Sequence, residues 1–96
     1  MSEPTEKEMV VHELKTDSDV FAESLRGDKP YEIRIDDRGI NPGDLLILKE
    51  TQYSGKEMKA GKPLIYTGMV LSRWVINKTT GYGLQEGWAI FGVRNA

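Results

Sequence analysis

Most of this 96-residue chain is patterned as short β-strands that end at turns rich in Gly, Pro, Asn and Asp. The clearest strand is predicted at residues 31–35, Tyr-Glu-Ile-Arg-Ile, where apolar and charged residues alternate strictly. Such a period of two is typical of a strand with one buried face. We therefore expect Tyr31, Ile33 and Ile35 to face the core, and the two charged residues between them to face solvent. Further strands are predicted at residues 9–14, 44–50, 64–76, with a bulge or break at Gly68, and 88–93.

One segment near the start of the chain is patterned as a helix instead. Asp17 or Ser18 can cap its N-terminus, and Gly27 follows it where a left-handed backbone commonly ends a helix. Pro30 prevents any continuation, because it lacks the N–H that the next helical turn needs. We therefore predict a helix at about residues 17–26. Its core-facing stripe is expected to consist of Val20, Phe21, Ser24 and Leu25.

Five or six short strands with one helix near the N-terminus predict a mainly β (α+β) fold. The expected architecture is a small closed or half-closed β-barrel over residues 9–96, capped by the helix. Closure removes the exposed edge strands that a small sheet would otherwise present. The lysine-rich segment 51–63 is expected to be a loop, or a loop with a weak hairpin, and residues 1–8 a flexible acidic tail.

Composition excludes several classes of function. The chain has no cysteine and a single histidine, so we expect no disulfide, no bound metal and no cofactor. The longest apolar run, Leu45–Leu48, is expected to be buried on both faces of its strand. It is far shorter than the roughly 20 residues that span a bilayer. The polar, acidic N-terminus does not resemble a signal peptide, so we expect a cytoplasmic monomer with no membrane partner.

Charge is distributed unevenly along the chain, although the net charge is only −2. Residues 13–44 contain nine acidic and five basic side chains, a net −4, whereas residues 49–78 contain six basic and two acidic ones, a net +4. One interpretation is that these are two solvated faces. The other is that the basic half contacts a polyanion, since a basic patch can steer binding even on a neutral protein.

Short charged motifs cluster around the predicted helix. They are His12-Glu13-Leu14-Lys15, Gly27-Asp28-Lys29, Glu32-Ile33-Arg34, Asp37-Arg38 and Gly43-Asp44, followed later by Tyr66-Thr67-Gly68 and Gly81–Trp88. In this order and spacing the chain resembles an ASCH-type domain of the PUA-like superfamily. More narrowly, it is similar to a family of small uncharacterised ASCH-like proteins from bacteria and phages. The resemblance covers residues 11–93.

The resemblance implies a β-barrel with a helix beside a cleft, and RNA or a nucleotide as the partner. Four cations around the helix suit a phosphate, since Arg grips it bidentately and Lys acts as a point charge. The expected phosphate-binding residues are Lys15, Lys29, Arg34 and Arg38, with His12, Glu32 and Tyr82 as possible supporting residues. The alternative is that neighbouring acids simply pair with these cations in a structural network.

Two other classes of function stay open. Some ASCH-type proteins are amidohydrolases that act on acetylated cytidine with Lys, Thr and Glu. Lys29 matches their lysine, but the threonine position is Glu32, whose carboxylate would hold the ammonium protonated. We therefore assign no catalytic residue and expect no such activity. A phage or host protein-interaction domain is the third class, and it predicts an exposed apolar patch.

Individual side chains receive separate expectations. His12 has no nucleophile motif nearby, so we expect a structural hydrogen bond at a strand end rather than a general base. The aromatic candidates for base stacking are Trp74, Trp88, Tyr53 and Tyr82, but the two tryptophans lie in alternating strand patterns and are expected in the core. Tyr82 lies in a glycine-flanked turn and is the better candidate for stacking on a base.

Overall fold

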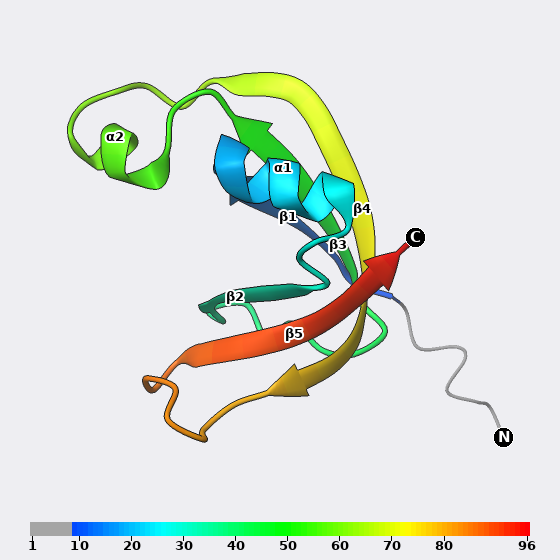
Figure 1. Ribbon diagram of the computed structural model, residues 1–96. Helices are drawn as coiled ribbons and strands as arrows, with labels where there is room; N and C mark the ends of the chain where they lie inside the picture. Colours follow the sequence, from blue (N-terminus) through cyan, green and yellow to red (C-terminus); the bar gives the residue numbers. More distant parts are fainter. Residues whose placement is uncertain (1–8) are drawn as a thin grey trace, which may run out of the picture.

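The computed structural model describes residues 9–96, which form a curled five-stranded sheet with two helices (Figure 1). The strands are β1 (Val11–Thr16), β2 (Tyr31–Ile35), β3 (Leu45–Thr51), β4 (Tyr66–Thr79) and β5 (Trp88–Asn95). The helices are α1 (Ser18–Arg26) and α2 (Gly55–Lys59). The predicted tail, residues 1–8, lies outside the described residues. No helix within residues 9–96 is long and apolar enough to cross a membrane.

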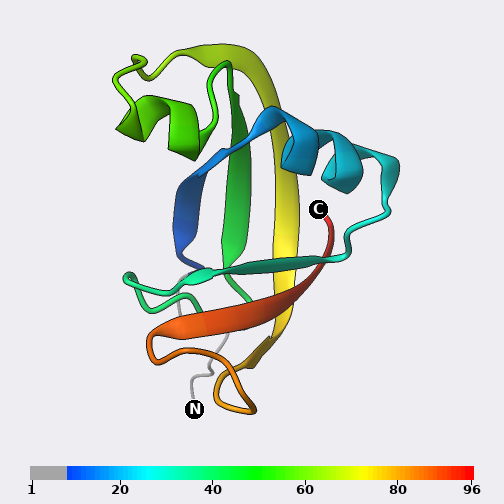
Figure 2. The same cartoon turned by 60° about the vertical axis from the view of Figure 1, so that its left-hand side comes forward.

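The strands lie in the order β1-β3-β4-β5-β2, so β1 and β2 are the two edges. β1 and β3 are parallel, and the other neighbouring pairs are antiparallel. The 14-residue β4 pairs with β3 through its first half and with β5 through its second half. This sharing curls the sheet into a half-barrel and brings the two edge strands near one another (Figure 2). The mainly β, barrel-like prediction is confirmed at this level.

Gly68 marks the bulge that the sequence predicts. Its φ is +97°, and the pairing with β3 shifts register between Lys49 and Thr51. A glycine adopts this left-handed backbone without the steric cost that a Cβ brings. The strand continues through the bulge to Thr79, three residues beyond the predicted end.

Helix α1 forms where the capping residues place it. Asp17 occupies the N-cap position and Gly27, at φ +82°, the C-cap position. Phe21 and Ser24 are buried against the sheet, but Leu25 is 54% exposed, so the buried stripe is narrower than predicted. The Ser18 hydroxyl donates to the Thr51 carbonyl at 3.0 Å, which ties the start of α1 to the end of β3.

The core lies between the sheet and α1. It consists of Leu14, Phe21, Ile40, Leu46, Leu48, Val75, Ala89, Phe91 and Val93. The prediction that the run Leu45–Leu48 is buried on both faces is wrong, because Leu45 and Ile47 are only half-buried. Trp74 and Trp88, expected in the core, are half-buried too.

The predicted orientation of β2 is also wrong. Glu32 is only 2% exposed, whereas the apolar side chains beside it are 42–55% exposed. Alternation fixes which residues share a face but not which face turns inward. Here Glu32 pairs with Phe91 and Arg34 with Ala89, and both of these β5 residues are fully buried. Pairing with β5 therefore turns the charged side of β2 toward the interior.

Segment 51–63 contains a helix that the sequence analysis did not predict. Ser54 caps α2 through a capping box, in which its hydroxyl accepts from the Glu57 N–H at 3.1 Å and Glu57 Oε1 accepts from the Ser54 N–H at 2.9 Å. Such reciprocal caps stabilise the first turn of a short helix. We call residues 52–65 the α2 arm, because they project from one end of the sheet (Figure 1).

Candidate functional site

The open side of the half-barrel lies between β1 and β2. At the start of the β1–β3 pair, the Val10 carbonyl accepts a hydrogen bond from Leu45 N. At the end of the β2–β5 pair, Asp36 N donates a hydrogen bond to the Gly87 carbonyl. Backbone N–H and C=O groups alternate in direction along a strand. The groups that point to the free edges therefore belong to residues 11, 13 and 15 of β1 and to residues 31, 33 and 35 of β2. We call the gap between these two edges the seam.

Two arginine side chains bridge the seam. Arg38 Nη1 donates to the Glu13 carbonyl at 2.7 Å, and Arg34 Nη2 donates to the Lys15 carbonyl at 3.4 Å. Both acceptors lie on the free edge of β1. Side chains rather than backbone pairs therefore hold the two edges together, which leaves space between the strands.

Two adjoining cavities occupy that space. The lysine cavity, of about 240 Å³, is lined by Lys15, Thr16, Asp17, Val20, Lys29, Glu32, Ile33 and Arg34. The tryptophan cavity, of about 320 Å³, is lined by Leu14, Ile33, Arg34, Ile35, Asp37, Arg38, Ile40 and Trp88. The two cavities share Ile33 and Arg34, and we call them together the seam groove.

The four cations singled out from the sequence all line the seam groove. Lys15, Lys29 and Arg34 line the lysine cavity, and Arg34 and Arg38 line the tryptophan cavity. Glu32 lines the lysine cavity with them. The other two supporting candidates line neither cavity: Tyr82 is 96% exposed in the β4–β5 loop, and His12 is buried elsewhere.

Lys29 and Glu32 form a buried ion pair in the lysine cavity. Lys29 Nζ lies 3.4 Å from Glu32 Oε2, and the two side chains are only 11% and 2% exposed. The ammonium also donates to the Tyr31 carbonyl at 3.0 Å and lies 5.0 Å from the centre of the Tyr31 ring. These contacts fix Lys29 in place. They also give Glu32 the cationic partner that a buried carboxylate requires.

Among the described residues that line the groove, Arg34 alone has a buried polar side-chain atom without a hydrogen-bond partner. Its Nε is buried and has no hydrogen-bond partner within the described residues, and its one hydrogen bond, to Lys15 O, is long at 3.4 Å. Burial lowers the pKa of the Arg34 guanidinium, against the opposing attraction of Glu32. A buried unsatisfied donor costs about 1–3 kcal/mol. A ligand that supplies acceptor atoms would therefore bind favourably here.

His12 has a structural role at the other end of β1. Its Nε2 and Asp44 Oδ2 share a hydrogen bond of 2.9 Å, and the same carboxylate oxygen accepts from the Asn41 N–H at 2.9 Å. Burial acts to raise the pKa of Asp44, but these hydrogen bonds outweigh it and lower that pKa. The pair ties the start of β1 to the turn before β3.

A larger cavity than either part of the groove lies elsewhere. It measures about 390 Å³ beside the β4–β5 loop and shares Trp88 with the seam groove. Its one cation, Lys78, already contacts Asp36 Oδ2 at 2.7 Å. Within residues 9–96 no three His, Asp or Glu side chains gather closely enough to hold a metal ion. A further cavity of about 270 Å³ is lined by Lys29, Arg73 and Arg94 without an acidic residue, but the Arg73 guanidinium already donates to the Ser72 and Ser24 carbonyls. The seam groove combines four cations with a buried donor that lacks a partner among the described residues, and it is therefore the candidate site.

Sequence reasoning missed several residues of this groove. Thr16 and Asp17 follow Lys15 directly, so their position between that lysine and the helix could have suggested them. Trp88, expected in the core, could not be placed in the groove in this way. It reaches the groove because it pairs with Ile35 across the β2–β5 register, a contact between residues far apart in sequence.

No curated protein matches this chain. The family model "Domain of unknown function (DUF3850)" matches residues 11–93, a range that runs from the first residue of β1 into β5. The matched range contains every residue that lines the seam groove. Because the match covers most of the chain, the protein belongs to the DUF3850 family.

Proposed function

We propose that the seam groove binds the phosphate of a nucleotide or of single-stranded RNA. The observation that carries the proposal is the environment of Arg34. The side chain is half-buried between the two cavities, its Nε is buried without a hydrogen-bond partner, and its five N–H groups make one hydrogen bond within the described residues. A phosphate offers several acceptor oxygens in the geometry that a guanidinium matches best.

The neighbouring charges support a small anionic ligand rather than a cation. Lys15 and Arg34 line the lysine cavity beside the Lys29–Glu32 pair, and Asp17 already accepts a hydrogen bond from Gly55 N at 3.0 Å. With both carboxylates engaged, Lys15 and Arg34 remain available to a phosphate.

The tryptophan cavity supplies a surface of different chemistry next to this site. Its lining includes the apolar side chains of Ile33 and Ile35 and the half-buried ring of Trp88, with Arg38 at the seam. An aromatic ring and apolar walls beside a phosphate site suit a ribose and base. The resemblance of the sequence motifs to ASCH-type domains of the PUA-like superfamily supports the same assignment, and a half-barrel is compatible with it.

A protein-interaction role is the second candidate, because β2 turns Tyr31, Ile33 and Ile35 partly to solvent. Exposed apolar side chains that cluster on one strand are typical of contact surfaces. The two candidates share Ile33 and Ile35, which also line the tryptophan cavity, but only the phosphate site requires the cations of the groove. Charge-removing variants inside the groove therefore weaken phosphate binding while leaving the exposed apolar side chains intact.

The proposal is tested by calorimetric titration with uridine monophosphate and with short single-stranded RNA. Arg34→Gln removes the charge that should hold the phosphate, and Lys15→Gln removes an exposed neighbour without disturbing buried groups. Arg26→Gln is the control, since Arg26 is exposed on α1 and, within residues 9–96, pairs with Asp28 alone. We expect each groove variant to weaken binding at least about tenfold, and Lys15→Gln to lower the salt slope for RNA by about 0.7. Equal affinities for all three variants and the wild type would rule the proposal out.

A further inference from the structure

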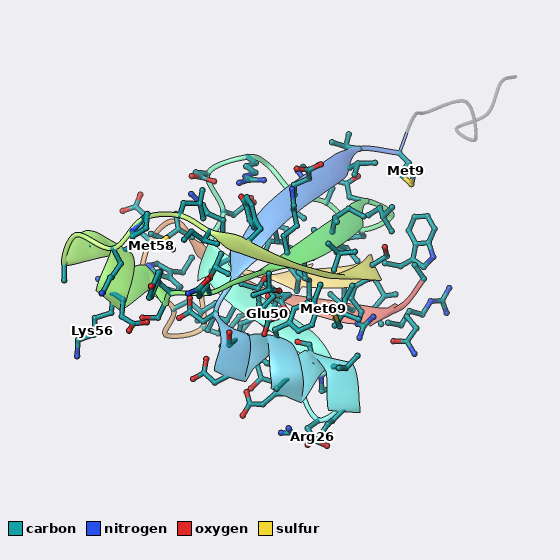
Figure 3. The ribbon with its side chains drawn as sticks, turned by 90° about the horizontal axis from the view of Figure 1, so that it is seen from above. Met9, Arg26, Glu50, Lys56, Met58 and Met69 are labelled. Carbon is teal, nitrogen blue, oxygen red and sulfur yellow. The ribbon has the colours of Figure 1, made fainter. Side chains whose placement is uncertain are left out.

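The α2 arm carries cations that the seam groove does not use. Lys56, Lys59 and Lys62 are all exposed, and the one acid of the helix, Glu57, is engaged in the capping box. Figure 3 shows Lys56 pointing outward at the end of the arm, far from Arg26 at the C-terminus of α1. Residues 61–70, which lead back into β4, are exposed throughout. The arm is therefore a solvated basic projection rather than a packed part of the core.

Two tyrosines in and beside the arm each have a lysine over the ring. Lys62 Nζ lies 5.2 Å from the centre of the Tyr53 ring, and Lys49 Nζ lies 4.4 Å from that of Tyr66. Together with Lys29 and Tyr31, this makes three such pairs in the described residues. All three distances lie within the roughly 6 Å at which a cation is attracted to the face of an aromatic ring. Each pair places a flat ring beside a cation, as base stacking and phosphate contact require.

The seam groove and the arm are connected at two points. Lys15, which lines the lysine cavity, lies directly opposite Lys49 in the β1–β3 register, so the two side chains share the outer face of the sheet. Asp17, which lines the same cavity, accepts the hydrogen bond from Gly55 at the start of α2. A chain leaving the groove at Lys15 therefore comes next to Lys49, which lies 3.4 Å from the exposed Glu13, and at Asp17 it comes next to the start of α2.

We propose that these side chains form a second contact surface for the same ligand, and that this ligand is a single-stranded RNA of several nucleotides rather than a free nucleotide. The surface, which we call the arm surface, consists of Lys49, Tyr53, Lys56, Lys59, Lys62 and Tyr66. The inference rests on the proposed function. Lysines contact successive phosphates and tyrosines stack on bases, a combination that tolerates any sequence.

Ligand length tests the inference. The full chain is titrated with uridine monophosphate, a hexauridylate and a dodecauridylate, and the same series is repeated with the triple variant Lys56→Gln, Lys59→Gln, Lys62→Gln. The three positions are exposed, so circular dichroism should show an unchanged fold. The matched control is the Arg26→Gln variant, which removes an exposed cation outside the arm.

We expect affinity to rise from the monophosphate to the dodecamer. The triple variant should lose roughly tenfold in dodecamer affinity and about 2 in salt slope, with little change for the monophosphate. Tyr66→Leu should also weaken the dodecamer while leaving the monophosphate unaffected, because it removes a stacking surface outside the groove. If the monophosphate binds but neither length nor the arm variants matter, the inference is wrong and the proposed function stands. If neither the monophosphate nor the RNA binds, both fail.

Discussion

Replacing Lys29 with Met tests the buried ion pair on which the geometry of the lysine cavity depends. The substitution keeps most of the side-chain volume and removes the cation 3.4 Å from Glu32, whose side chain is 2% exposed. A buried charge left without its partner typically costs 3–5 kcal/mol, which is about a third or more of the stability of an average domain. For a domain of this size such a loss lowers the melting temperature by more than about 10 °C.

The chain contains a matched control for this prediction. Lys49 Nζ lies at the same 3.4 Å distance from Glu13 Oε1, but those side chains are 29% and 66% exposed. Lys49→Met should therefore cost only about 0–1 kcal/mol. The double variant Lys29→Met, Glu32→Met should recover most of the loss, because an apolar pair of similar volume avoids the unpaired charge.

Urea denaturation of the wild type, of the single variants Lys29→Met, Glu32→Met and Lys49→Met, and of the double variant measures these differences. The mutant cycle should give a coupling energy of at least about 2 kcal/mol between Lys29 and Glu32. A cost below about 1 kcal/mol for Lys29→Met, equal to that of Lys49→Met, would refute the reasoning. It would mean that Glu32 does not face the interior and that β2 has the opposite orientation.

Three further predictions concern other parts of the molecule. Because the pKa of Asp44 is lowered in the folded protein, its stabilising effect is present above its unfolded pKa and is lost as pH falls through the folded one. The stability advantage of the wild type over Asp44→Asn, measured in urea, should be full at neutral pH and shrink below about pH 4. Gly68→Ala should lower the free energy of unfolding by more than about 1 kcal/mol, and the positive φ alone is the cause, since a Cβ there meets no other atom. Gly55→Ala, measured in urea in the same way, should leave the free energy of unfolding unchanged or raise it. Acetylcytidine should not be hydrolysed at a measurable rate, because two of the three N–H groups of Lys29 are already engaged in hydrogen bonds. Chromatography of the reaction mixture measures turnover. Turnover by the wild type that is lost in the Lys29→Ala variant would contradict this prediction.

The parts of the fold that local chemistry determines were predictable from the sequence. The position of α1 between Asp17 and Gly27 and the irregularity at Gly68 follow from local residue types, and both occur as expected. The Asp17 carboxylate, however, makes no capping hydrogen bond and accepts from Gly55 N instead. The α2 capping box was also readable, since Ser54 and Glu57 have its three-residue spacing, but the surrounding glycines and lysines masked that signal.

The orientation of β2 could not be predicted in the same way. Its alternation was correct, but the inward face is chosen by its partner β5 and by the ion pair that allows Glu32 to be buried. Both contacts depend on residues outside the strand. The same inversion turns Arg34 into the seam, so the candidate site was found from its residue types although the expected side-chain direction was wrong.

For the residues of the groove, too, some neighbours could be predicted from local sequence and others could not. Lys15 and Lys29 could be placed near each other because they flank one predicted helix. The bridging of the seam could not be anticipated, because Arg38 reaches the Glu13 carbonyl only after the whole sheet has curled. Edge-to-edge contacts of this kind follow from the twist of the sheet and from strand order rather than from any local pattern.

The central claim, that the seam groove binds a phosphate-bearing ligand, is tested most directly by titrating the ¹⁵N-labelled full chain with uridine monophosphate. The account predicts that amide resonances of Lys15, Lys29, Arg34 and Arg38 shift progressively and saturate, and that Arg34→Gln abolishes the saturation. Shifts confined to the β4–β5 loop, or the absence of any shift at millimolar ligand, would contradict it.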